Sequence, residues 1–216
     1  MDSLAAFMAS LDTAALLALL VRVAAVLLCL TVHETCHGFA AYLMGDRTAK
    51  AERRLSLNPL HHIDWFGFAA MLFLGFGWAK PVPVDMRYFK NPKKGMALTA
   101  LAGPVSNLLL AVIVLFAMRL VYYHGAIWML PLLSFLYVTA MLSVGLGLFN
   151  LIPIPPLDGS KVLFSLLPDR YYIRLMQYER YGILLLYVII FAGLLDNFLG
   201  NAVNAVFAFL LEWIVF

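Results

Sequence analysis

Residues Ala14 to Met44 read AALLALLVRVAAVLLCLTVHETCHGFAAYLM, and this stretch decides the fold class. A helix that crosses a bilayer needs about 20 mostly apolar residues, and the stretch exceeds that length. It stops at Gly45-Asp46, a pair that favours the end of a helix. It also contains Arg22, two histidines and a glutamate, which are costly in lipid and usually face protein or water. The stretch therefore predicts a long membrane helix with a polar, functional face.

The composition of the whole chain is that of an integral membrane protein. Of the 216 residues, 64% are apolar and 12% are charged, whereas soluble domains average roughly 45–50% and about 25%. The mean hydropathy is +0.91. A soluble fold could not bury this much apolar surface. The formal net charge is only +3, with the basic residues in loops, so we expect no nucleic acid partner.

Five further apolar stretches follow the first, at residues 65–79, 96–120, 127–152, 181–195 and 198–216. The stretch 65–79 is short for a full span, so we expect it to re-enter the membrane. The motif Ala102-Gly-Pro-Val-Ser-Asn107 is expected to interrupt the stretch 96–120. The prolines of residues 150–159 are expected to end the stretch 127–152. We predict an all-α integral membrane protein, a bundle of about five to six transmembrane or re-entrant helices.

The loops between these stretches predict the orientation of the chain. Residues 47–58 contain four Lys or Arg, residues 80–94 contain five and residues 161–180 contain four, whereas the loop near Arg119 contains one and the break near residue 196 none. By the positive-inside rule, the first helix ends in the cytoplasm and the proline-rich turn before Asp158 lies on the same side. Residues 47–57 and 80–85 are expected to be extended or irregular near the site.

The motif His33-Glu34-Thr35-Cys36-His37 matches H-E-x-x-H. On a helix, the two histidines share one face and can bind a single Zn²⁺, and Glu34 can reach a water at the metal. The alternative is a polar helix face buried against other helices. His33 lies 12 residues before Gly45, roughly 18 Å along a helix, so the metal is expected well below the cytoplasmic surface.

A catalytic zinc has three protein ligands and one open position. Asp158 is the best candidate for the third ligand, because it lies in a helix-breaking turn on the side predicted for the two histidines. Its alternative role is to cap the helix that starts near Gly159. His61 and His62 could also be ligands, although we expect one to orient its loop and the other to be solvated.

With these residues in hand, the chain resembles the site-2 protease family, the intramembrane zinc metalloproteases. The resemblance covers residues 31–168 and rests on five motifs: HETCH at 33–37, LSLNPLHHID at 55–64, GWAKPVPV at 77–84, ALAGPVSN at 100–107 and FNLIPIPPLDGS at 149–160. It implies one Zn²⁺ per chain, bound by His33, His37 and Asp158, with Glu34 as the catalytic base. It also implies an oxyanion or substrate-orienting role for Asn107, and a substrate contact for Asn150.

The resemblance further implies hydrolysis of peptide bonds within or near transmembrane segments of membrane-anchored substrates. The partners would be a membrane protein with a transmembrane helix and the lipid bilayer, with a multi-pass chain in the cell membrane and its active site toward the cytoplasm. The loops are too short for a PDZ or CBS domain, so we expect residues 1–216 to form a single transmembrane metalloprotease domain.

Two alternatives stay open. The first is a non-catalytic membrane zinc-binding protein or transporter on the same fold, although transporters usually have inverted repeats or a second polar site, which the sequence does not show. The second concerns residues 47–57 and 80–85, which either pair with an unwound substrate strand by β-augmentation or are simple loops.

Overall fold

The computed structural model describes residues 12–67, 69, 79–125 and 129–216. Within these ranges the regular structure is helical apart from one isolated antiparallel bridge between Ile63 and Ala79, which confirms the all-α prediction. Four helices are long and apolar enough to cross a membrane: α2 (Thr13–Leu43), α5 (Pro92–His124), α6 (Leu130–Asn150) and α9 (Asp196–Ile214). The chain is therefore a multi-pass membrane protein.

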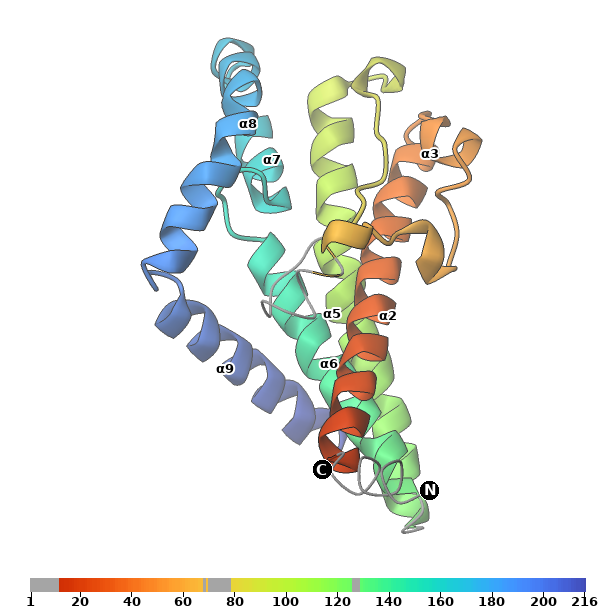
Figure 1. Ribbon diagram of the computed structural model, residues 1–216. Helices are drawn as coiled ribbons and strands as arrows, with labels where there is room; N and C mark the ends of the chain where they lie inside the picture. The colour runs from red at the N-terminus through yellow and green to blue at the C-terminus, as the bar shows by residue number, and fades with distance from the viewer. Residues whose placement is uncertain (1–11, 68, 70–78, 126–128) are drawn as a thin grey trace, which may run out of the picture.

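The core is formed by three of these helices. α5 packs against both α2 and α6, and α2 also contacts α6 (Figure 1). α9 crosses obliquely and packs on α6 and α5, where it completes a buried apolar cluster. By contrast, Ile113, Phe209 and Trp213 are between 64% and 71% exposed, as expected for side chains that face lipid.

Shorter elements connect the long helices. They are α3 (Thr48–Ala51), η1 (Pro59–His61), η2 (Met86–Tyr88), α7 (Asp158–Ser165) and α8 (Asp169–Phe191). The apolar part of α8, Tyr181–Phe191, is shorter than the four candidate spans. The predicted re-entrant stretch 65–79 lies largely outside the described residues.

The first helix has the limits that its sequence predicts. α2 begins after Asp12, whose carboxylate accepts hydrogen bonds from the backbone N–H groups of Ala14 and Ala15 at 3.1 and 3.0 Å. It ends at Leu43, two residues before the predicted stop at Gly45. One continuous helix therefore contains the complete H-E-x-x-H motif.

The predicted interruption of the second span is wrong. α5 continues through Pro104, which lies inside the helix and is fully buried. A proline within a helix costs about 3 kcal/mol because it removes one hydrogen bond. Here the carbonyl of Pro104 lies in close contact with α6, 3.1 Å from the position a Cβ would take on Gly147. Packing against this neighbour outweighs the local cost.

Two further expectations need correction. Residues 47–57 are not all extended, because the Asp46 carboxylate accepts from the Thr48 backbone N–H and hydroxyl and starts the short helix α3. Residues 161–195 do not divide near position 180. They form the end of α7 and then a continuous α8, which begins after Pro168 and meets no further proline. Residues 80–85, as expected, contain no helix.

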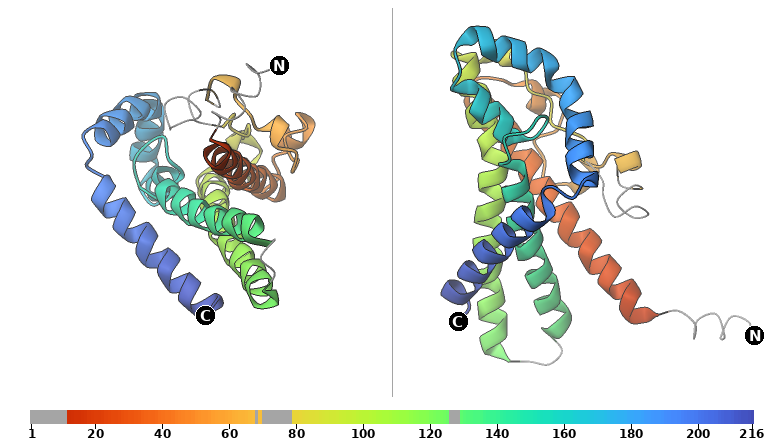
Figure 2. Two further views of the ribbon diagram at one scale, coloured as in Figure 1. Left: turned by 60° about the horizontal axis from the view of Figure 1, so that its bottom comes forward. Right: turned by 90° about the vertical axis from the view of Figure 1, so that its left-hand side faces the viewer.

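α7 and α8 stand at the edge of the bundle. The proline-rich turn ends α6 at Asn150, and α7 returns to pack against α5. α8 then follows the outer side of the molecule to reach α9, as Figures 1 and 2 both show. This arrangement brings the first residue of α7 close to the histidines of α2.

Candidate metal centre

The two histidines of α2 converge on one point. His33 and His37 are one helical turn apart, and their Nε2 atoms are 2.9 Å from each other. Both residues are buried, with 4% and 9% of their surface exposed. Two imidazoles held this close inside an apolar bundle present paired nitrogen ligands to a cation.

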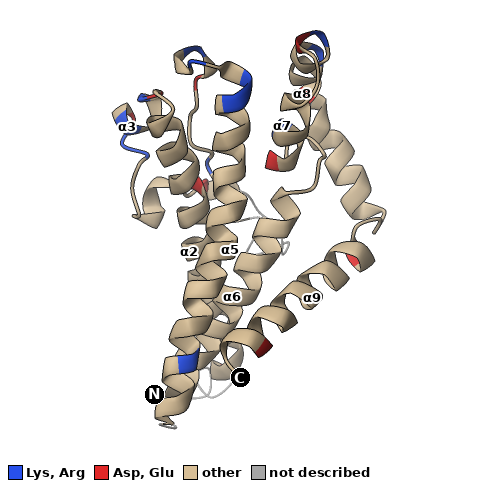
Figure 3. Ribbon diagram, turned by 180° about the vertical axis from the view of Figure 1, so that it is seen from behind, with Lys and Arg blue, Asp and Glu red and all other residues tan. Residues whose placement is uncertain are grey.

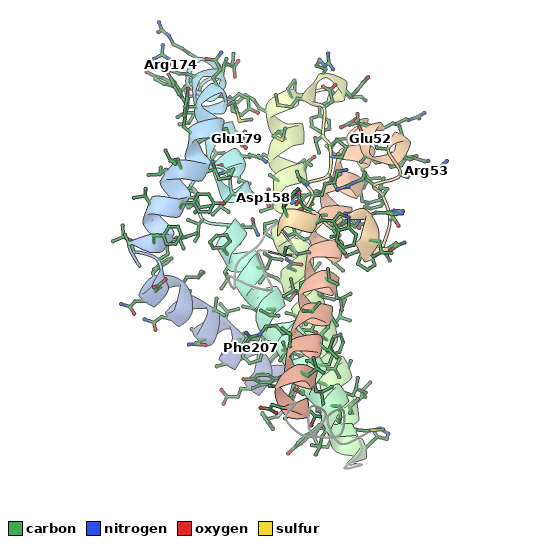
Figure 4. The ribbon with its side chains drawn as sticks, viewed as in Figure 1. Glu52, Arg53, Asp158, Arg174, Glu179 and Phe207 are labelled. Atoms are coloured by element: carbon green, nitrogen blue, oxygen red, sulfur yellow. The ribbon has the colours of Figure 1, made fainter. Side chains whose placement is uncertain are left out.

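Asp158 supplies an oxygen to the same point. It is the first residue of α7, and its Oδ2 lies 3.2 Å from the Nε2 atoms of both His33 and His37. Figure 4 shows Asp158 between α7 and the helices that it faces. Leu157 is the N-cap of α7, and the carboxylate of Asp158 contacts the two histidines, so Asp158 does not serve as the cap of this helix.

The three ligand atoms fit a zinc ion. Ligand atoms at the usual zinc distances in a tetrahedral site lie about 3.3 Å apart, and the observed separations are 2.9 to 3.2 Å. Among the described residues, this is the one group of three His, Cys, Asp or Glu side chains that could hold a metal ion. The donor set of two imidazoles and a carboxylate is also one that zinc accepts.

Buried partners fix the orientation of both imidazole rings. His37 Nδ1 lies 2.7 Å from the Thr99 carbonyl oxygen, so Nδ1 donates and Nε2 is left for a metal. His33 Nδ1 lies 3.1 Å from the side-chain amide of Asn107, which is fully buried. A metal on His33 Nε2 places the proton on Nδ1, so the Asn107 oxygen must face the ring. In that orientation the oxygen accepts from the ring, and the amide nitrogen takes the place in which the oxygen has no partner.

Two glycines allow the close approach of the elements that carry the ligands. A Cβ on Gly103 of α5 would lie 2.4 Å from His37 Nε2, and a Cβ on Gly159 of α7 would lie 2.2 Å from the Leu151 carbonyl oxygen. Gly103 therefore lets α5 pass directly beside the histidines. Gly159 lets the start of α7 lie against the proline-rich turn, which sets the position of Asp158.

Glu34 borders a cleft beside the three ligands. Its Oε2 accepts a hydrogen bond of 2.9 Å from the backbone N–H of Val82. The cleft has a volume of about 350 Å³, and residues from α2, segment 80–85, α5, α6, α7 and α8 line it. A carboxylate at this position can take and return a proton in the cleft.

Asn150 and Asn107 occupy different places. Asn150, at the end of α6, lines the cleft, and its amide nitrogen donates to the Leu146 carbonyl at 2.9 Å. Asn107 lies behind His33 with none of its surface exposed. This geometry favours ring positioning for Asn107, and the oxyanion role implied by the resemblance stays a prediction.

The remaining candidate ligands do not join the group. His62 is buried, and its Nε2 lies 2.7 Å from the Ser56 carbonyl oxygen, so this ring orients its loop. His61 is exposed. The nearby Asp64, which is not one of these candidates, caps the next turn by accepting from the backbone N–H groups of Phe66 and Gly67.

Sequence reasoning missed the backbone groups of the site. The Thr99 carbonyl and the Val82 N–H contact His37 and Glu34, yet a backbone group leaves no mark in the identity of its residue. It also missed the ion pair of Lys161 and Glu179, 3.6 Å apart at the edge of the cleft. For Val82, the one available signal is the pattern Lys80-Pro-Val-Pro-Val84, in which neither proline has an N–H.

An all-α membrane bundle with a buried group of two histidines and an aspartate beside a glutamate defines a class of membrane metalloenzymes. Comparisons with known proteins give the family. The family model described as "Peptidase family M50" matches residues 119–195, which include Asp158. No solved structure matches the chain.

Curated relatives extend the match over most of the sequence. The chain is 41% identical over 179 residues to "Putative zinc metalloprotease YwhC" of Bacillus subtilis (strain 168), which covers 81% of this chain and 82% of that protein. It is 30% identical over 191 residues to "Putative zinc metalloprotease Rip2" of Mycobacterium tuberculosis (strain H37Rv), covering 84% and 70%. The protein of that name from Mycolicibacterium smegmatis is 29% identical over 191 residues. The chain belongs to peptidase family M50, the site-2 protease family, and is a zinc metalloprotease of that family.

Proposed function

We propose that the protein is an intramembrane endopeptidase that cuts membrane-anchored proteins within or near their transmembrane segments. One observation supports this most strongly. The ligand atoms of His33, His37 and Asp158 converge at 2.9 to 3.2 Å inside a bundle of apolar helices, with Glu34 on the same cleft. A protease whose site is built into membrane helices is suited to substrates that lie in the same bilayer.

Each residue of the site has a proposed task in peptide hydrolysis. His33, His37 and Asp158 would hold one Zn²⁺ per chain, and Asn107 and Thr99 would keep the two rings in place. A bound zinc ion supplies Lewis-acid activation of a water and of the scissile carbonyl. Glu34 takes the proton that the attacking water loses as its oxygen bonds to the carbonyl carbon. Glu34 then gives that proton to the amine as the C–N bond breaks.

The charge distribution supports an active site that opens toward the cytoplasm. Lys and Arg residues gather at the end of the molecule formed by α3, the start of α5 and the start of α8 (Figure 3). Basic loops favour the cytoplasmic side. The cleft lies toward this side, because its lining includes segment 80–85, Met96 near the start of α5 and the first turn of α7.

The substrate must present an extended strand to this cleft, because the carbonyls of an intact helix are engaged in its own hydrogen bonds. Segment 80–85 lines the cleft and is the better candidate for pairing with that strand, since α3 is helical. Pro81 and Pro83 have no N–H, and the carbonyl oxygens of residues 80 and 81 already accept from Arg54, so the pairing would use the carbonyl oxygens of residues 82–84. Asn150 would contact the same strand from α6.

The experiment compares the parent protein with Glu34→Gln after reconstitution into liposomes with zinc. The probe is a quenched fluorescent peptide with a leucine-alanine span of about 20 residues interrupted by Asn-Gly. We also compare the new N- and C-termini that cleavage creates in membrane proteins, using membranes that contain either the parent protein or Glu34→Gln. We expect cleavage inside spans by the parent, and loss of cleavage with zinc retained in the variant.

The matched control is Glu52→Gln, because Glu52 is exposed at the surface, away from the cleft (Figure 4). It should cleave as the parent does. A Glu34→Gln protein that cleaves at the parental rate would contradict the mechanism. A zinc-loaded parent that cuts neither the peptide nor any membrane protein would favour the non-catalytic zinc protein.

A further inference from the structure

We propose that buried Arg54 is a positioning residue for Glu34, acting through the backbone of residues 80–82. The inference rests on the proposed role of Glu34 as the base. Val82 is the donor that touches Glu34, through the 2.9 Å bond from its backbone N–H to Oε2. The position of Glu34 therefore depends on what holds this segment, which has no helix or sheet of its own.

Arg54 holds the segment from the side of α3. It is only 6% exposed, and its terminal nitrogen donates to the carbonyl oxygens of Lys80 at 2.5 Å and Pro81 at 3.1 Å. Among the described residues, no carboxylate forms an ion pair with it. Burying a guanidinium without a counter-charge is costly, so its two backbone partners are its main compensation within the protein.

The same segment is fixed at three other points. The Lys80 N–H donates to the His62 carbonyl at 2.9 Å. At the far end, the Asp85 N–H donates to Asp46 Oδ2 at 2.7 Å, and Asp46 is fully buried. Between these points the Val82 side chain lies close to α2, 3.1 Å from where a Cβ on Gly38 would stand. Gly38 is one turn after Glu34, so this contact sets the register of Val82 against the base.

The sequence leaves Val82 as the one residue between Lys80 and Val84 with a backbone N–H to donate. Pro81 and Pro83 have no N–H, so between Lys80 and Val84 one backbone N–H remains, and it points at Glu34. A glutamate has three rotatable bonds and loses rotamer freedom when it is held. In our proposal the bond to Val82 holds Oε2 so that Oε1 receives the proton in a fixed place. Arg54 touches neither substrate nor metal and acts through Val82.

The test uses two pairs of variants and the quenched peptide defined above. Arg54→Gln and Arg54→Lys are compared with Arg53→Gln, because Arg53 is the exposed neighbour (Figure 4). Val82→Pro removes the donor itself and is compared with Val82→Ala, which shortens the same side chain but keeps the backbone N–H that donates to Glu34. For each protein we measure kcat, KM, zinc per chain and the thermal unfolding midpoint.

We expect Arg54→Gln and Val82→Pro to lower kcat about 10- to 100-fold, because a base displaced by about 1 Å loses that much. KM and zinc content should stay within about twofold of the parent. Arg54→Lys should recover part of the loss, since one ammonium can still donate to one carbonyl. The double variant should lose little more than either single one, because both act on the same contact.

Three results would overturn the inference. One is a normal kcat per folded, zinc-loaded molecule in both Arg54→Gln and Val82→Pro. Another is a rise in kcat in these variants, which would mean that the backbone N–H of Val82 restrains Glu34 and slows the reaction. The third is full additivity in the double variant. These results differ from failure of the proposed function, in which Glu34→Gln itself cleaves normally.

Discussion

A methyl group at position 103 should disable the metal centre without disturbing the helix that carries it. In the structure, a Cβ on Gly103 would lie 2.4 Å from His37 Nε2 and 2.7 Å from His33 Cε1. Ordinary contacts begin at 3.4 Å, so the His37 ring must move by about 1 Å. Metal ligands tolerate deviations of only about 0.2 Å, and the bond from His37 to the Thr99 carbonyl opposes the movement.

The expected loss of zinc affinity in Gly103→Ala is about 100-fold, or ~2.7 kcal/mol, at the upper end of the range for a disturbed ligand environment. Alanine has a higher helix propensity than glycine, by up to about 1 kcal/mol, so α5 itself should not be weakened. The measurement is a competition titration of purified protein with a zinc chelator, with the helix content followed by circular dichroism.

The control is Gly145→Ala on the neighbouring helix α6. A Cβ there would meet no atom within 4 Å, so this variant should bind zinc as the parent does. If Gly103→Ala also keeps the parental affinity with native helix content, our account of the packing of α5 against the two histidines is wrong.

Three further predictions follow from the same geometry. Asp158→Ala should lower zinc occupancy strongly, whereas Glu179→Ala, on the same cleft, should not; equal occupancy in the two would point to another third ligand. Asn107→Leu should weaken zinc binding about 10- to 100-fold through loss of the contact to His33. An unchanged dissociation constant for zinc would show that Asn107 does not position the His33 ring. In a background without the native cysteines, a cysteine in place of exposed Lys50 should react with an impermeant maleimide only from the cytoplasmic side. A cysteine in place of exposed His124 should react only from the other side. The reverse pattern would show that the chain has the opposite orientation in the membrane.

The parts of the site that side chains define could be predicted from the sequence. His33 and His37 are spaced by one helical turn, and this spacing alone places both on one face of a helix. Asp158 could be chosen because a carboxylate next to a proline-rich turn in an apolar stretch has few other uses. The fold brings these three together across 125 residues of sequence.

Other parts depend on tertiary packing that local patterns do not contain. Pro104 predicts a break, yet α5 continues because its neighbours stabilise it. Arg54 looks like one of four basic loop residues, and only the fold shows that it is buried against the backbone of residues 80 and 81. Backbone partners such as the Thr99 carbonyl are equally invisible, because any residue could supply them.

The separation of the ligands along the chain also bears on biogenesis. The histidines leave the ribosome early, whereas Asp158 follows 125 residues later, roughly 6–25 s afterwards at ordinary rates of synthesis. Until α6 has been inserted and α7 has folded back onto α5, the nascent chain has only two of its three ligands. The order of synthesis therefore leaves the group of three incomplete until α2, α5 and α6 have all been made.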